Sequence, residues 1–354
     1  MSGVGNTFKS NGMFDYGRSA LQLTINAIIN SVNDLKNVDS ILNKISKTSN
    51  LTSSELKSLK KSSFDISGKY GKKASDYLTG VQSISRNGYK GKEAEHLAQM
   101  SLLAQAAGDI NSNTANSYLM ASNAAYQYQG NIQKLNTVLD GQTKIASTHS
   151  LSMQDMAAAT IEAASMASEL GVQENQLSAM IGTIVSKTKA GGSEVGSELK
   201  TLLTNVQNIR NSDIADTFRE AGVAQTVFAN GITQLRNPVN VLEDLSTVFN
   251  TLDSSDSLKT DILANIGKGM QTDNLSALLT GWNAYKQMLQ DYSESNGNAA
   301  ILAEKNAASW EGATNRLGNT FSKFTQNFAN SDLIVSSTDA LTGLVSVFDK
   351  ITSL

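Results

Sequence analysis

The sequence contains a single proline, Pro238, among 354 residues. Average proteins carry about 5% proline. Proline breaks the interior of a helix and cannot donate a hydrogen bond to a sheet ladder. Its near absence is therefore typical of a chain built from helices, whose ends must be marked by glycine and asparagine instead.

Composition narrows the classes of protein further. Cysteine is absent, which excludes disulfides, thiol nucleophiles and thiolate metal sites and fits synthesis in a reducing cytoplasm. The net charge is −3, and the densest run of lysines, between Lys57 and Lys73, is interpreted as a solvated helix face, so no specific nucleic-acid binding is predicted. No apolar run of about 18 residues occurs, so no membrane span is expected, and Met1–Gly12 lacks the apolar region of a signal peptide.

Apolar residues recur at steps of three and four through most of the chain, which predicts a multi-helix bundle of short amphipathic helices. Residues 152–171 give the clearest case, with Ser152 as N-cap, Asp155 at the third helical position and Gly171 after the end. We expect an irregular segment over 1–17, a helical region over 18–150, core helices with a hairpin over 151–297, and a long helix followed by a terminal helix over 298–354. The long helix is expected to run unbroken from 298 to 330.

One short stretch, residues 223–235, departs from the helical pattern. Asn230-Gly231 lies between two runs of residues that favour β-strands, a combination that predicts a tight β-hairpin. Directly after it, Asn237 is expected to cap a helix that has Pro238 in its first position, where the missing N–H has no cost. The fold class is therefore mainly α with one small β-hairpin.

Residues able to carry chemistry are few and scattered. His96 and His149 are 53 positions apart, and neither has a partner at the spacing of metal ligands. Ala190-Gly191-Gly192 is followed by Ser193-Glu194-Val195-Gly196, not by the Gly-Lys-Ser or Gly-Lys-Thr ending of a phosphate loop, and is interpreted as a helix–helix hinge.

The remaining candidates also have simple structural interpretations. The paired carboxylates Glu243 with Asp244 and Asp253 with Asp256 are expected to be solvated rather than catalytic. Core packing is expected for two groups of side chains, namely Trp282 and Trp310, and Met153, Met156, Met166 and Met180. We therefore predict that the protein is not an enzyme, with no catalytic, cofactor-binding or metal-binding residues and no cofactor.

Residues 181–210 read IGTIVSKTKAGGSEVGSELKTLLTNVQNIR. This stretch resembles the core of phage tail tape-measure proteins, where a helix ends near Thr-Lys, Gly-Gly-x-x-Val-Gly follows, and a Leu-Lys-Thr helix begins. Downstream, Asn230-Gly231-Ile232, Arg236 and Leu242-Glu243-Asp244-Leu245 resemble the next landmark of the family. With weaker matches on both sides, the resemblance covers roughly residues 38–328.

The resemblance implies a structural role in the assembly of a phage tail. Tape-measure proteins occupy the lumen of the tail tube while tube subunits polymerise around them, and the length of the tail follows the length of the polypeptide. The implied partners are the tail tube protein, tail assembly chaperones and baseplate or tail-tip proteins, with possible self-association. The implied location is the virion tail lumen, and the bacterial host cytoplasm during assembly.

A second class of protein shares this composition. Secreted or surface helical filament proteins and translocator-like proteins also lack cysteine and are rich in Ala, Ser, Asn and Thr. They differ at their ends, where terminal helices pair in a coiled coil, whereas Met1–Gly17 is expected to be irregular here. This difference at the ends favours the tape-measure interpretation over the filament or translocator-like class.

Overall fold

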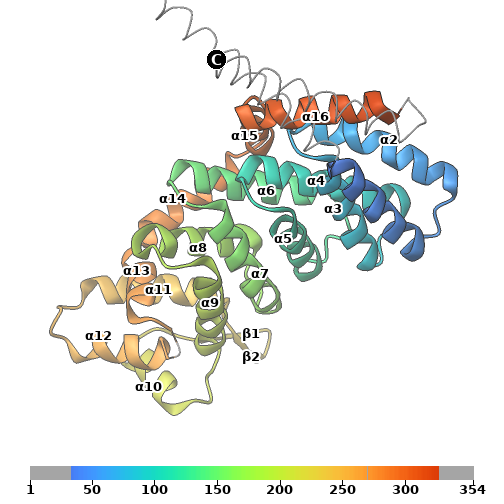
Figure 1. Ribbon diagram of the computed structural model, residues 1–354. Coiled ribbons are helices and arrows are strands. Elements are labelled where there is room, and N and C mark those ends of the chain that lie inside the picture. Colours follow the sequence, from blue (N-terminus) through green and yellow to red (C-terminus); the bar gives the residue numbers. More distant parts are fainter. Residues whose placement is uncertain (1–32, 269, 327–354) are drawn as a thin grey trace, which may run out of the picture. The chain divides into compact units, whose positions relative to one another are not determined.

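The computed structural model describes residues 33–268 and 270–326. This part of the chain is mainly α-helical with one two-stranded antiparallel hairpin (Figure 1), so the predicted fold class is confirmed. The chain divides into two compact units, one formed by residues 95–304 and the other by the residues before and after them. The expected segments 1–17 and 341–351 lie outside the described residues.

The unit outside residues 95–304 is an assembly of helices drawn from both ends of the described chain. Residues 33–48 are helical and are followed by α2 (Ser53–Lys69) and α3 (Ala74–Arg86). Helix α16 (Trp310–Gln326) packs against α2 although some 250 residues separate them. Thr52 and Glu55 start α2 with a reciprocal capping box, and Asn319 of α16 donates to Lys72 O at 2.9 Å.

The unit over residues 95–304 is a larger bundle of short helices joined by tight turns. Its helices α5 to α9 are Ser112–Ala125, Ile132–Thr148, Met153–Glu169, Glu174–Thr188 and Gly192–Val206. Its later elements are α10 (Ser212–Glu220), α11 (Pro238–Thr251), α12 (Ser257–Asp261), the π-helical turn η1 (Ile262–Ile266), α13 (Thr272–Thr280) and α14 (Trp282–Ser293). The division between the units falls within α4 (Gly91–Gly108) and α15 (Asn298–Ala307).

Helix α7 is central to this bundle because its small side chains allow neighbours to approach closely. Ala157, Ala159, Ala163, Ala164 and Ala167 are buried on it, and α5, α8 and α9 all pack against it. Gln142 of α6 adds a buried polar link, since its Nε2 donates to Thr160 on α7 at 3.1 Å and to Ser178 on α8 at 3.0 Å. The core is therefore held by close backbone approach and by hydrogen bonds between a few buried side chains.

The start signals near residue 237 and residue 152 are confirmed. Ser152 accepts hydrogen bonds from the N–H groups of Gln154 and Asp155 at the start of α7. Asn237 accepts from Val239 N at 2.9 Å, and Pro238 is the first residue of α11. For α5 the sequence predicts Ser112 or Asn113 as the cap. This prediction is wrong by one or two positions, because Asn111 accepts from Thr114 N at 2.9 Å.

Two predicted helices are divided in the structure. The expected helix over 298–330 is broken at Ala308-Ser309, where α15 ends and α16 begins. The apolar spacing also predicts one amphipathic helix over 274–292, and this helix is broken at Gly281, between α13 and α14. The glycines at positions 68 and 71 predict a loosened or broken helix there, but α2 runs through Gly68 to Lys69.

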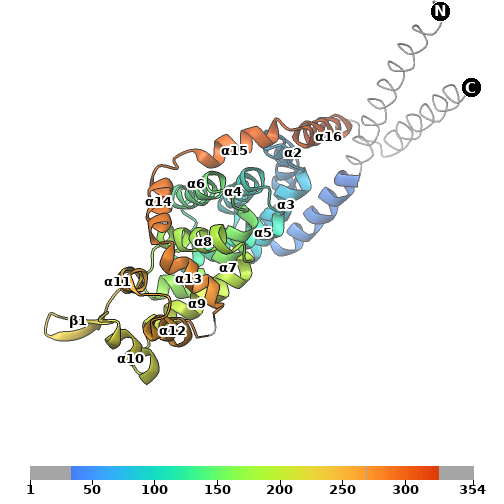
Figure 2. The ribbon, with the colours of Figure 1, turned by 90° about the vertical axis from the view of Figure 1, so that its left-hand side faces the viewer.

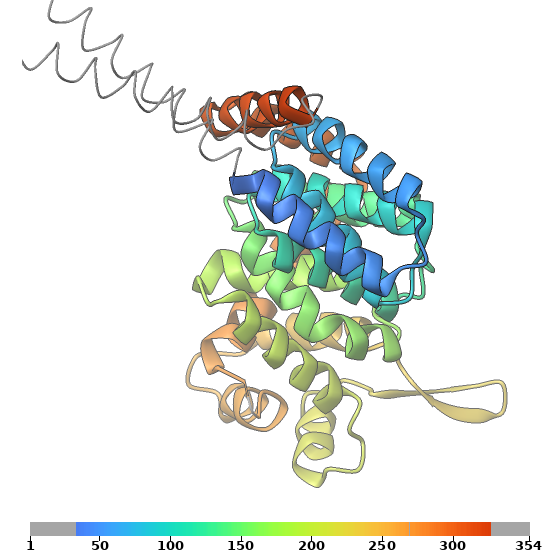
Figure 3. The same cartoon turned by 45° about the vertical axis from the view of Figure 1, so that its right-hand side comes forward.

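The hairpin consists of β1 (Thr226–Ala229) and β2 (Ile232–Leu235), paired from Thr226 opposite Leu235 to Ala229 opposite Ile232. Asn230 and Gly231 form its turn with φ of 54° and 80°. Positive φ at both central positions is the requirement of a type I′ turn, which Asn-Gly meets at low cost. Figures 2 and 3 show the hairpin extending away from the helices of its own unit.

Candidate functional site

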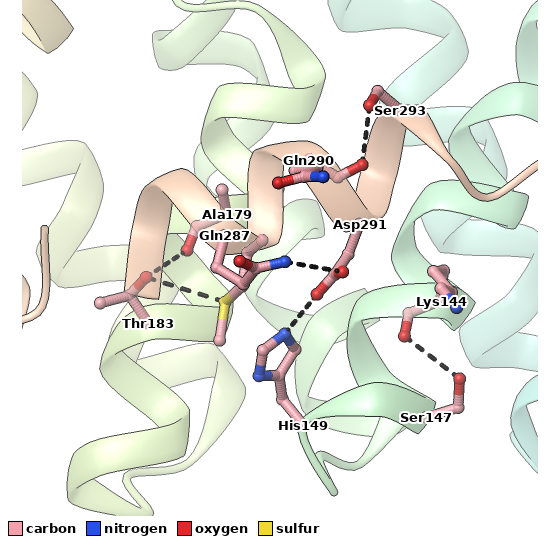
Figure 4. A network of polar contacts seen from close by, with 10 residues as sticks. Lys144, Ser147, His149, Ala179, Thr183, Gln287, Gln290, Asp291 and Ser293 are labelled. Carbon is pink, nitrogen blue, oxygen red and sulfur yellow. Dashed lines mark hydrogen bonds and ion pairs between the residues drawn. The ribbon is translucent and has the colours of Figure 1, made fainter. Parts of the chain in front are cut away.

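His149 is the predicted candidate that acquires a partner in the fold. It follows the last residue of α6, and its Nε2 lies 2.7 Å from Oδ2 of Asp291 on α14. Figure 4 shows this pair, with Gln287 donating to the other oxygen of Asp291 at 3.3 Å. The pair joins the end of α6 to α14. Sequence reasoning missed it because 142 residues separate the two side chains.

The surroundings of this pair do not complete a nucleophilic triad. Ser147 and Ser293 lie in the same view, but each hydroxyl donates to a backbone carbonyl of its own helix, Lys144 O and Gln290 O (Figure 4). A triad needs a hydroxyl within hydrogen-bond reach of the histidine. The contact between His149 and Asp291 links the end of α6 to α14, and His96 is exposed on α4.

The other carboxylates singled out by sequence have surface or capping roles. Glu243 pairs with Lys286 at 2.7 Å, and Asp244 pairs with Arg236 at the same distance. Asp256 caps α12 through Leu258 N. In the described ranges, no group of three or more His, Asp or Glu side chains is arranged to hold a metal ion. The predicted lack of catalytic and metal sites stays a prediction.

The predicted packing roles are largely confirmed. Trp282 is buried and stacks on Tyr285 with ring centroids 4.5 Å apart. Met153, Met156 and Met180 are buried, and Met166 is half-buried. The side chain of Trp310 lies outside the described part. No described helix is long and apolar enough to cross a membrane.

The glycine-rich stretch at residues 190–196 joins α8 to α9, as predicted, but packing explains its glycines better than a hinge does. A Cβ on Gly192 would come within 2.1 Å of Asp155 O, and one on Gly196 within 2.5 Å of Ala159 O. These contacts are with backbone atoms of α7 and leave no room for a side chain. Glycines one turn apart therefore let α9 lie directly on α7.

The start of α9 also lacks the opening that a phosphate would need. Asp155 of α7 accepts a hydrogen bond from Gly192 N at 3.0 Å, so a carboxylate already occupies the helix N-terminus where an anion would bind. Together with the missing lysine of a phosphate loop, this contact supports a structural interpretation of the stretch.

Carboxylates cap distant helices elsewhere in the same unit. Asp140 accepts from Gly297 N and Ala299 N at the start of α15, at 2.8 and 2.9 Å. Glu198 accepts from Gln271 N at 2.9 Å beside the start of α13. These contacts pair acids with the positive ends of helix dipoles across long sequence separations.

The hairpin is the most unusual surface in the described residues. Val227, Phe228, Ile232 and Leu235 are all exposed, Phe228 by 74%. The strand register places Phe228 and Leu235 on one face of the ribbon and Val227 and Ile232 on the other. The sequence predicted the hairpin but not its exposure. Contiguous exposed apolar side chains mark contacts with other proteins, so the hairpin is a candidate interaction element.

The comparison with protein families agrees with a structural role. Residues 60–268 match the family described as phage-related minor tail protein. That range spans α3 to η1 in full, including the glycine-packed α7–α9 pair and the hairpin. No solved structure matches the chain.

Proposed function

Because the chain belongs to the family of phage-related minor tail proteins, we propose that it is the core of a tape-measure protein. In this role it occupies the lumen of the growing tail tube, helps to set tail length, and performs no catalysis. The observation that carries this function is the order of landmarks inside the matched range. The Gly-Gly-x-x-Val-Gly junction, the Asn-Gly hairpin and the Leu-Glu-Asp-Leu helix follow one another as in tape-measure cores.

The architecture is compatible with a polypeptide that fills a tube. The described chain is a series of short helices of about 5 to 18 residues with small residues at their contacts. Such helices can separate from one another and align end to end along a tube, because no large sheet has to be disrupted. We assign residues 151–297 to the tape-measure core, flanked by residues 18–150 and 298–354.

The implied partners are the tail tube protein, the tail assembly chaperones and the proteins of the baseplate or tail tip. We propose that the hairpin contacts one of these proteins. A two-stranded ribbon is marginal on its own in water, and apolar side chains on both of its faces gain stability when a partner covers them. The alternative class, a secreted or surface helical filament or translocator-like protein, is distinguished by the ends of the chain. Both ends lie outside the described residues.

The position of the protein in the virion tests this function directly. Purified virions are treated with protease before and after the tails are opened, and peptides of this chain are quantified by mass spectrometry. We expect the chain to be present in intact tails and protected until they are opened. Absence from purified virions, or cleavage in intact tails at the rate of an exposed protein, would contradict a place in the lumen.

A hairpin variant tests the proposed contact surface. Replacing Phe228 and Ile232 together by serine should change the free energy of unfolding by no more than about 0.5 kcal/mol, because both side chains are exposed. The same variant should lose co-purification with tail proteins when expressed beside them. Gln234→Ser, on the same strand, is the matched control and should behave as wild type. Wild-type co-purification of the double variant would exclude the hairpin as the contact.

A further inference from the structure

A cavity of about 510 Å³ lies within the unit over residues 95–304, a size within the range of small-ligand pockets. It lies where the end of α5, the turn between α7 and α8, and helices α6 and α14 meet. Its walls include the rings of Tyr126, Tyr128 and Tyr292, and the carboxylate of Glu174 belongs to its lining. No motif pointed to it, because its residues come from four separate stretches.

Glu174 differs from Asp140 and Glu198, two other buried acids of this unit. Asp140 and Glu198 each receive backbone N–H groups of a distant helix. Glu174 receives the Tyr128 hydroxyl at 2.8 Å on Oε2, whereas Oε1 is buried without a hydrogen bond of ordinary geometry. Among the described residues it has no ion-pair partner within 4 Å. Burial raises its pKa to about 7, against the opposing influence of the Ser122 and Tyr128 hydroxyls.

Further polar groups on α5 lack partners beside this carboxylate. Tyr118, Ser122 and Tyr126 are spaced by four positions and so share one face of the helix. The hydroxyls of Tyr118 and Tyr126 are buried without a hydrogen bond in the described structure, whereas the Ser122 hydroxyl is directed at Glu174. Burial raises the pKa of Tyr118 and Tyr126, and the nearby Glu174 adds to the effect. Of these three residues only Tyr126 lines the cavity, so its hydroxyl and Oε1 of Glu174 are the buried oxygens that a group in the cavity could reach. Each unsatisfied buried group costs about 1–3 kcal/mol, which favours a ligand that supplies partners to both.

The residues that line the cavity indicate which charge a bound ligand would carry. An anion is disfavoured by Glu174, and an apolar ligand would leave the Tyr126 hydroxyl and Glu174 Oε1 unsatisfied. Tyrosine ring faces attract cations, and Lys134 already places its Nζ 5.4 Å from the centroid of the Tyr128 ring. Tyr126 and Tyr128 stack with centroids 5.9 Å apart, and the ring of Tyr292 packs against α6, where a Cβ on Gly141 would collide with it.

We propose that this cavity binds an organic cation, an alkylammonium or guanidinium group, with its nitrogen against Glu174 and its carbon atoms against the tyrosine rings. The cation forms the ion pair that Glu174 lacks and donates hydrogen bonds to Glu174 Oε1 and to the Tyr126 hydroxyl. Two sources share this chemistry, a free amine and a lysine or arginine side chain of another protein. The site is independent of the tail function proposed above.

Isothermal titration of the full chain at pH 8 tests the site with n-butylammonium and n-butylguanidinium as probes. We expect one saturable site per chain for at least one cation, and no binding of 1-butanol or butyrate, which match the probes in size. Glu174→Gln should weaken binding roughly tenfold or more, whereas Glu169→Gln, at an exposed position of α7, should not. Binding should also weaken below pH 7, where Glu174 takes up a proton.

A substitute variant and two further probes complete the binding experiment. If Glu174→Gln fails to fold, Tyr126→Phe, which keeps the ring and removes the hydroxyl, takes its place with the same expected direction. Spermidine and N-acetyl-lysine-methylamide distinguish the sources, since a site for free amines excludes the capped lysine and a site for a protein side chain accepts it. No saturable binding of any cation up to about 10 mM, equal binding of 1-butanol, or a crystal structure of the soaked protein with only water in the cavity would overturn the proposal.

Discussion

Gly196→Ala should lower the free energy of unfolding by about 2–4 kcal/mol, although alanine is the better helix former. The Cβ of alanine at this position would lie 2.5 Å from Ala159 O and 2.8 Å from the Cα of Ala159. Backbone atoms cannot rotate away as a side chain can, so α9 must move off α7, the helix that forms the most extensive contact in the described bundle. Gly192→Ala should have a similar effect, because its Cβ would meet Asp155 O at 2.1 Å.

Urea unfolding followed by circular dichroism measures both variants. Ser197→Ala, next to Gly196 but exposed, is the control on the same helix and should change the free energy of unfolding by less than about 0.5 kcal/mol. Gly68→Ala in α2 is a second control, because its Cβ would meet only Asn319 Nδ2 at 3.7 Å. If Gly196→Ala is as stable as wild type, α7 and α9 do not lie in backbone contact and the glycine-rich stretch is a hinge after all.

The second large effect is a dependence of stability on pH that comes from Glu174. Burial raises the pKa of its carboxyl from 4.5 to about 7 in the folded protein. The folded state therefore binds the proton more tightly than the unfolded state. The stabilisation is fully present below pH 4.5 and is lost as the pH rises through 7. At about 1.4 kcal/mol per pKa unit, the loss amounts to roughly 3 kcal/mol.

Glu174→Gln isolates this contribution because glutamine keeps the shape and removes the titration. We expect the variant to unfold at a higher urea concentration than wild type at pH 8, and the advantage to shrink steadily towards pH 5. Glu169→Gln provides the control at an exposed position of α7. Comparing variants at each pH cancels the titration of all other groups. A difference between Glu174→Gln and wild type that is the same at every pH would show that the carboxyl is not buried as described.

Much of the fold could be predicted because its signals are local. Ser152 before α7, Asn237 with Pro238 before α11, and Asn230-Gly231 in the hairpin each act through atoms a few residues away. Such signals are complete in the sequence, and the structure has the corresponding elements. The apolar spacing likewise gave the helices from α6 to α9 with ends within a few residues of those observed.

The errors arise where distant parts of the chain decide the local structure. The break between α15 and α16 has no proline or glycine at Ala308-Ser309, but Gly71 approaches Ala307 and Gly312, where a Cβ would come within 3 Å of both backbones. Asn315 then donates to Gly71 O at 2.8 Å. A straight helix through this point would forfeit that packing. The break at Gly281 has a similar origin, because Thr183 of α8 lies within 2.6 Å of the place a Cβ would take.

The cavity beside Glu174 could not be predicted for the same reason. Nothing in the spacing of Tyr126, Glu174 and Tyr292 indicates that their side chains converge. The exposure of Phe228 could not be predicted either, because an apolar residue in a strand is ordinarily assigned to a core. Both features depend on which neighbours the fold places beside them.

Tail length in the phage that encodes this chain is the most direct measure of the tape-measure function. Residues 91–125, comprising α4 and α5, are deleted in frame in one phage and duplicated in another, and tails are measured by electron microscopy. At about 1.5 Å per helical residue, the tails should become roughly 50 Å shorter and 50 Å longer, respectively. Assembled tails of unchanged length in both phages would contradict the account.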